Sequence, residues 1–155
     1  MPRQAGGDPE LTFKDEECLF RLLQSNHFDA AGVTIDAIDL LGTSVDREMF
    51  RDSPDACLPA QPSKLVAVAS VVFGALPENI QNPNSPDGLR DVVVVYLPEN
   101  GNMAHSEIRT CLSECTENNK PGSKAFKAHI KCVLAAVFEV VVEPIVPHPI
   151  DDEFA

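Results

Sequence analysis

The stretch LVAVASVVFG at residues 65–74, together with DVVVVYL at residues 91–97, decides the fold class of this chain of 155 residues. Both stretches are rich in valine, and β-branched side chains favour the pleated geometry of a strand. Their apolar character is continuous, which is typical of strands that are covered on both faces. The connecting residues 79–90, NIQNPNSPDGLR, carry two prolines and an Asp-Gly pair, as a long exposed loop does. We expect the two strands to pair antiparallel across this loop.

A helix and a third strand are predicted near the carboxyl end of the sequence. Ser123 can cap the segment KAFKAHIKCVLAAV, in which apolar residues recur at helical spacing. The residues of that apolar stripe are Phe126, Ile130, Val133, Leu134 and Val137. The segment FEVVVEPIV then reads as a strand that its prolines end. The sequence therefore predicts an α+β fold with a mainly antiparallel sheet of three or more strands, residues 65–74, 91–97 and 137–143, and with helices packed on one face.

Other helical signals are weaker. Thr12 and Asp15 resemble a capping box for a helix over residues 12–25, although a strand through CLFRLL at residues 18–23 stays open. Ser53-Pro54-Asp55 predicts a short helical turn at residues 54–58. Asn102 can cap a helix over MAHSEIRTCLSEC. Residues 28–45 follow neither the helical nor the strand spacing of apolar residues, so their structure is left open.

The chain has the length of one domain, which we assign to residues 10–146. Residues 1–9 combine glycines and prolines without an apolar pattern, and we expect them to form a flexible tail. Residues 147–155 are expected to form an acidic tail, and we find no sign of a second domain.

Composition narrows the classes of function. The chain carries 24 acidic and 12 basic residues, so its field repels nucleic acid and anionic membrane surfaces. No apolar run reaches the length of a membrane span, and no secretory signal is recognisable at the start. The 5 cysteines are scattered and odd in number, which favours reduced thiols over a disulfide framework. We therefore expect a soluble, cytoplasmic protein.

The common phosphate-loop, dinucleotide-binding, zinc-protease and serine-hydrolase motifs are absent from the sequence. His105 and Glu107 are the candidate catalytic pair, because a histidine and a glutamate after a strand can share general acid-base work. The competing interpretation is a surface histidine and a capping acid, which would point to different sides of the predicted helix.

The candidate ligand-binding residues are Arg21, Ser44, Asp46 and Arg47. Arg21 lies inside the apolar run LFRLL, so its guanidinium must reach solvent or find a buried anion. Arg47 could bind a carboxylate or phosphate through two hydrogen bonds, with Ser44 and Asp46 beside it. Local capping and ion pairing within the cluster is the alternative for these three residues.

Cys111, Cys115, His129 and Cys132 could converge on a zinc ion if two predicted helices packed antiparallel. The spacing lacks the short CxxC pair that is typical of structural zinc sites. We therefore interpret these cysteines as small buried side chains, and we expect no metal and no other cofactor.

Several motifs together resemble a family of small uncharacterised bacterial proteins. They are LFRLL, HFD, SVDREMF, SPDACL and LPENGNMAHSEI, and they span residues 19–108. The family pattern has an arginine near the start, an SVDR-like motif and an HxEI-like motif. The resemblance implies no activity, but it implies that Arg21, Asp46, Arg47, His105 and Glu107 share a pocket.

Two functions follow as hypotheses. The first is an accessory or protein-interaction protein whose partner is another protein, because catalytic signatures are missing and the chain is acidic. The second is a small enzyme or toxin-like domain that acts on a phosphorylated or nucleotide ligand. Arg21 and Arg47 would then hold the anion and His105 or Glu107 would move a proton. Whether the chain forms a homo-oligomer is left open.

Overall fold

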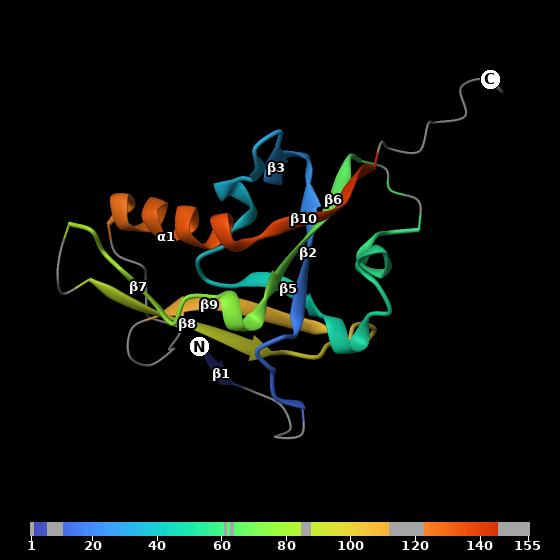
Figure 1. Ribbon diagram of the computed structural model, residues 1–155, viewed down its shortest axis with the longest axis horizontal. Helices are drawn as coiled ribbons and strands as arrows, with labels where there is room; N and C mark the ends of the chain where they lie inside the picture. The colour runs from blue at the N-terminus through green and yellow to red at the C-terminus, as the bar shows by residue number, and fades with distance from the viewer. Residues whose placement is uncertain are drawn as a thin grey trace.

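The computed structural model describes residues 2–5, 11–60, 62, 64–84, 88–111 and 123–145, with only the backbone of Arg3, Ala5 and Cys111. Within this part of the chain, one sheet of eight strands dominates, in the order β1-β8-β9-β5-β2-β6-β10, and β7 pairs with β8. A second sheet consists of the small hairpin β3-β4. Figure 1 shows how the chain is arranged around the large sheet.

The strands are β1 (Arg3–Ala5), β2 (Cys18–Gln24), β3 (Phe28–Asp29), β4 (Gly32–Val33), β5 (Thr43–Arg47), β6 (Val66–Val72), β7 (Asn79–Gln81), β8 (Leu89–Tyr96), β9 (His105–Cys111) and β10 (Glu139–Ile145). The helix α1 comprises Lys124–Val137. Short 3₁₀ turns connect the strands: η2 (Ser25–His27), η3 (Ile35–Ala37), η4 (Glu48–Phe50), η5 (Pro54–Cys57) and η6 (Phe73–Ala75).

The mainly antiparallel sheet is confirmed, and all three predicted strands belong to it as β6, β8 and β10. The predicted pairing of residues 65–74 with residues 91–97 is wrong, because β2, β5 and β9 lie between β6 and β8. Strand β8 instead pairs antiparallel with β9, which follows after the turn at Gly101. This glycine has a positive φ of 88°, a conformation that glycine adopts without a steric penalty.

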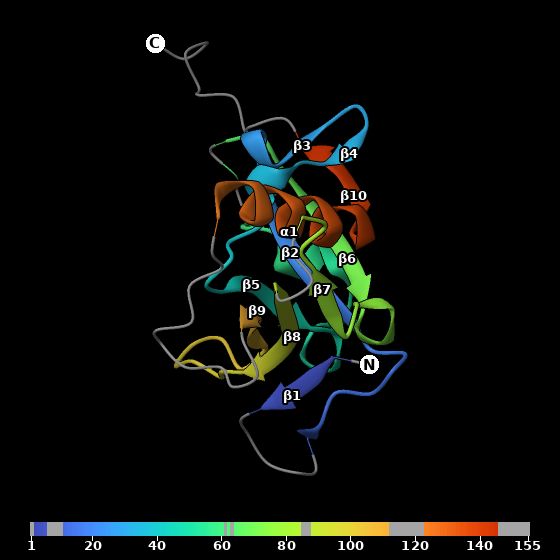
Figure 2. The same cartoon turned by 90° about the vertical axis from the view of Figure 1, so that its left-hand side faces the viewer.

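Helix α1 is close to its predicted bounds. Ser123 caps it, since its side chain accepts a hydrogen bond from the backbone N–H of Phe126. In the part of the chain that the structure describes, α1 is the one α-helix, so the plural helices expected on one face are reduced to this one. Figure 2 shows α1 lying in front of the strands. The buried residues of α1 belong to the main core cluster: Phe126, Ile130, Leu134 and Ala135.

Two segments expected to be helical are strands. Residues 18–24 form β2, the alternative that the sequence left open, and residues 105–111 form β9. In β9 the burial alternates, with Ser106 and Ile108 buried and with His105 and Glu107 half-buried. This period of two is typical of a strand. It could not be recognised in the sequence, because some residues on the buried face of β9 are small and polar.

The predicted tails and the predicted turn have different outcomes. Arg3–Ala5, which we expected to be part of a flexible tail, form β1 and pair in parallel with β8. The acidic tail of residues 147–155 lies outside the described residues. At residues 54–58 the predicted turn is present as the 3₁₀ turn η5, which Ser53 precedes in an extended conformation.

The sheet has two distinct faces. One face carries the main core, where residues from β2, β6, β8, β9 and α1 form a single apolar cluster. The other face is contacted by η5, which lies against β2, β6 and β10. Because η5 is a short turn, part of this second face stays accessible beside it, and the candidate site lies there. Among the described residues, no helix is both long and apolar enough to cross a membrane.

Candidate functional site

The candidate site begins where two strands separate. Strands β2 and β5 pair only at Leu19↔Arg47 and Phe20↔Asp46, and β5 then turns toward β9. Arg21 occupies the resulting gap. Its Nε donates to the carbonyl oxygen of Ala37 at 2.9 Å and its Nη1 to that of Ser44 at 2.9 Å. The guanidinium thus satisfies two backbone carbonyl groups at the gap, one of the turn η3 and one of β5.

A cavity of about 510 Å³ lies beside this gap. Its volume is in the range of roughly 300 to 1,000 Å³ that is usual for small-molecule sites. Of the predicted site residues, the structure places Arg21, Ser44, Asp46 and His105 in its lining. The other lining residues are Phe20, Leu22, Gln24, His27, Val45, Arg51, Cys57, Gly101 and Asn102.

Asp46 holds one wall of the cavity through a closed polar network. Its Oδ2 accepts hydrogen bonds from Nε and Nη2 of Arg51 at 3.2 and 3.1 Å, and its Oδ1 accepts one from Nδ2 of Asn102 at 3.0 Å. Arg51 Nη2 also donates to Oδ1 of Asn102 at 2.7 Å. Burial, and next the charge of Asp46, raise the pKa of the neighbouring Cys57 thiol to about 11. Cys57 is therefore a neutral thiol at pH 7, not a nucleophilic thiolate.

His105 and Glu107 lie on the same side of β9, because residues two apart in a strand share a face. This corrects the expectation that a helix would point them apart. The Nε2 atom of His105 lies 3.8 Å from Oε2 of Glu107 and 3.5 Å from Oε1 of Glu99. Glu107 is also held by Arg109, whose Nε and Nη2 donate to its Oε1. Both separations are longer than a usual hydrogen bond, and Glu107 itself does not line the cavity.

Arg47 belongs to a different part of the molecule. Its side chain is fully buried and pairs with Glu17, with Nε to Oε2 at 2.9 Å and Nη2 to Oε1 at 2.7 Å. Its guanidinium also donates to the carbonyl oxygens of Leu11 and Thr12. The described hydrogen bonds of this guanidinium all go to Glu17, Leu11 and Thr12, and Arg47 does not line the cavity that Arg21 lines.

Four polar residues of the cavity wall were not predicted from the sequence as site residues: Gln24, His27, Arg51 and Asn102. His27 stands in the HFD motif, directly before the segment of residues 28–45 that fits neither the helical nor the strand period. Asn102 was interpreted as a helix cap. Arg51 has no signal of its own, since its pairing with Asp46 depends on the path of η4.

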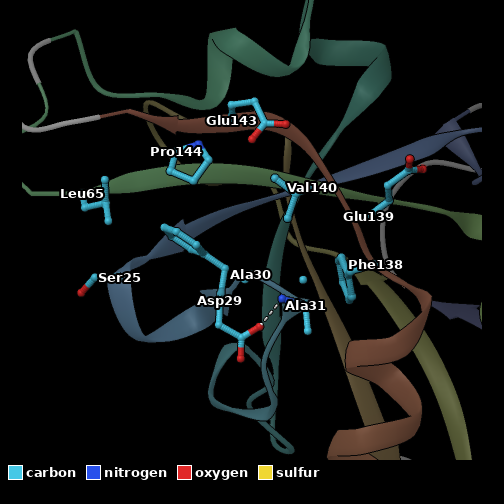
Figure 3. A pocket seen from close by; sticks show the side chains of 12 residues that line it. Ser25, Asp29, Ala30, Ala31, Leu65, Phe138, Glu139, Val140, Glu143 and Pro144 are labelled. Atoms are coloured by element: carbon cyan, nitrogen blue, oxygen red, sulfur yellow. Dashed lines mark hydrogen bonds between the residues drawn. The ribbon is translucent and has the colours of Figure 1, made fainter.

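A second cavity, of about 700 Å³, lies at the edge of the sheet between the β3-β4 hairpin and β10. Figure 3 shows its lining, with Asp29 on the hairpin and with Glu139 and Glu143 on β10. Most of the rest of its wall is apolar, with Ser25 and Gly32 completing the lining: Phe28, Ala30, Ala31, Leu65, Phe138, Val140 and Pro144. We call this cavity the edge groove.

The zinc set that the sequence suggested is only partly within the described residues. Cys115 and the side chain of Cys111 lie outside them, and Cys132 is exposed on α1. Where the structure describes the side chains, His, Cys, Asp and Glu form no group that could hold a metal ion.

Comparison of the chain with protein-family models, with curated proteins and with solved structures finds no match. The resemblance of residues 19–108 to a bacterial family therefore stays a prediction.

Proposed function

We propose that this chain is an accessory protein that binds another protein through the edge groove, and that the groove receives an extended segment with both basic and apolar side chains. The observation that carries the proposal is the combination of a mainly apolar wall with charged lining residues that are all acidic, at the open edge of the sheet.

The wall of the groove supplies apolar contact area. Phe138 is 8% exposed and anchors the bottom, where α1 passes into β10. Val140 on β10 and Leu65, which directly precedes β6, extend this apolar wall, as Figure 3 shows. Apolar side chains of a partner would be removed from water here, which stabilises the complex by about 25 cal/mol per Å² of apolar surface buried.

The rim of the groove determines the sign of the partner's charge. Asp29, Glu139 and Glu143 are exposed, and none of the described residues that line the groove is basic. The described ion pairs within 4.0 Å leave these three carboxylates unpaired. Oxygen Oδ1 of Asp29 accepts a hydrogen bond from the N–H of Ala31, which fixes the turn and leaves its charge exposed. Lysine or arginine side chains complement such a rim, and they would be attracted by the net charge of −12 as well.

The geometry of β10 favours binding by side chains over the addition of a new strand. Its pairing with β6 shifts register twice, between Val140 and Val142 and between Val142 and Ile145. Pro144 has no N–H to donate, and irregularities of this kind protect an exposed sheet edge against further pairing. We therefore propose that the partner binds mainly through its side chains and not through backbone hydrogen bonds to β10.

The test uses a random peptide library that is displayed on phage and selected against the full chain. We expect the selected peptides to combine Lys or Arg with apolar residues and to bind less tightly as salt rises, because exposed ion pairs are screened. The double variant Glu139→Lys/Glu143→Lys should weaken their binding by about tenfold or more in calorimetry.

The matched control is Glu16→Lys/Asp52→Lys, which changes the net charge equally at two exposed acids that do not line the groove. It should keep the peptide Kd within about threefold, the effect expected of long-range charge alone. N-methylation of alternate peptide amides should also leave the Kd nearly unchanged. Selection of acidic peptides, or equal loss in both double variants, would contradict the proposal.

A second candidate function is a small enzyme or toxin-like domain that acts on a phosphorylated or nucleotide ligand. It is favoured by one observation, the presence of Arg21, Ser44, Asp46 and His105 in the lining of a single cavity. In this hypothesis Arg21 holds the anion and His105 moves a proton, with Glu107 beside it.

For the enzymatic hypothesis, the full chain is incubated with a panel of nucleotides and phosphate esters and followed by ³¹P NMR. Turnover of a member of the panel, lost in His105→Ala at unchanged thermal stability, is the expected result. Absence of turnover across the panel would remove this candidate and would leave the edge groove unaffected.

A further inference from the structure

The strand gap leaves an arginine with unused donors. A guanidinium has five N–H groups, and those of Arg21 that are engaged belong to Nε and Nη1. Among the described residues, no carboxylate lies within 4.0 Å of it, whereas Arg47, Arg51 and Arg109 each have one. Burial lowers the pKa of Arg21, and the charge of Asp39 opposes that effect only in part. Arg21 is therefore a half-buried cation whose remaining N–H groups can bind an anion.

His27 adds a second donor at the same place. Its Nδ1 accepts the backbone N–H of Gln24 at 3.1 Å. The neutral imidazole must then carry its proton on Nε2, which makes that nitrogen a donor. Burial, and next the charge of Arg21, lower the pKa of His27, while Asp36 acts in the opposite direction.

The two residues also link two cavities. Arg21 and His27 line the cavity of about 510 Å³ and a neighbouring cavity of about 480 Å³, which reaches Lys131 of α1. Charged and titratable groups around His27 in these two cavities are Arg21, Asp36, Asp39, Lys131, Asp46, Arg51, Cys57 and His105.

The charges that line the larger cavity are more favourable for binding an anion than those of the smaller cavity. The one carboxylate among the described lining residues of the larger cavity, Asp46, already pairs with Arg51, so no carboxylate of this lining pairs with Arg21. The hydroxyl of Ser44 is exposed at the same wall, and Phe20 and Leu22 supply apolar surface beside it. The smaller cavity contains Asp36 and Asp39, which disfavour an anion.

We propose that the gap between β2 and β5 is an oxyanion-binding site, in which Arg21, His27 and Ser44 hold the carboxylate or phosphate group of a small molecule whose apolar part lies against Phe20 and Leu22. The site is independent of the edge groove. This proposal rests on the cavity of the second candidate function and names the chemical group that the cavity recognises. It predicts binding of that group and does not depend on catalytic turnover.

The test is an NMR titration of the full chain with inorganic phosphate and, separately, with acetate, at constant ionic strength set by chloride. We expect saturable shifts of the Arg21 Nε and His27 side-chain signals, with a Kd in the millimolar range for such small probes. Bound phosphate should also move the pKa of His27 upward, because a nearby anion favours the charged imidazolium. Saturation by phosphate, by acetate or by both supports the site and identifies the oxyanion that fits it.

Three variants make the result specific. Arg21→Gln should raise the Kd of the saturating probe by about tenfold or more, and Ser44→Ala by about twofold to fivefold. Ser44 is exposed and its hydroxyl has no hydrogen-bond partner among the described residues, so this variant keeps the test valid if Arg21→Gln does not fold. Arg109→Gln removes a positive charge outside the cavity and should leave the Kd unchanged. Shifts that do not saturate, or an equal loss in Arg109→Gln, would overturn the inference, whether or not the chain turns over any phosphate ester.

Discussion

Replacing Arg47 with methionine is expected to lower the free energy of unfolding by about 3 to 5 kcal/mol, as measured by urea denaturation. Its guanidinium forms a two-point pair with the buried carboxylate of Glu17. It also lies 3.9 Å from the ring centroid of Phe13 and 4.9 Å from that of Tyr96. The variant removes these cation-π contacts and leaves the charge of Glu17 in the core without a partner.

Two further variants test that explanation. Glu17→Leu in the Arg47→Met background should recover part of the loss, because it removes the uncompensated charge. Arg109→Met is the matched control, since its side chain is 36% exposed and its pair with Glu107 is worth about 0 to 1 kcal/mol. A loss below about 1 kcal/mol for Arg47→Met would show that the pair with Glu17 is not buried.

Replacing Leu134 with alanine is expected to cost about 2 to 5 kcal/mol of the same free energy, through lost transfer energy and a cavity. Leu134 is 2% exposed and belongs to the core cluster that α1 shares with the sheet. Urea denaturation again measures the effect.

Lys127→Ala on the exposed side of α1 is the control for the helix and should change stability by no more than about 0.5 kcal/mol. Equal effects of the two substitutions would mean that the apolar stripe of α1 does not face the core.

The strands rich in valine and the helix after Ser123 could be predicted from the sequence, because each has one dominant period over most of its length. Strand β9 could not, because Ser106 and Thr110 occupy its buried side, where a sequence pattern requires apolar residues. Strand order was also out of reach. Strand β6 pairs with β2 and β10, and both of these strands are formed by residues distant from β6 in the chain.

For the candidate site, the family resemblance implied one pocket for Arg21, Asp46, Arg47, His105 and Glu107. Arg21, Asp46 and His105 line one cavity, together with the separately predicted Ser44, whereas Glu107 does not line it. Alternation along β5 turns Arg47 to the opposite face. Adjacent residues in a strand face opposite ways, so Asp46 and Arg47 could share a site only in a helix or a turn. Once residues 43–47 are known to form a strand, that separation follows directly.

The order of strands in the sheet has a consequence for the rate at which the chain folds. Strand β9 returns directly along β8 through residues 97–104, so this hairpin closes a short loop and can form early. The two outer strands depend on distant partners, since Arg3 pairs with Val93 and Glu139 with Ser70. Such pairings require the closure of long loops before any contact is gained, which places the chain among slow folders, with times of about milliseconds to seconds. Strand β10 and the edge groove beside it would then be completed late, after the central strands have formed.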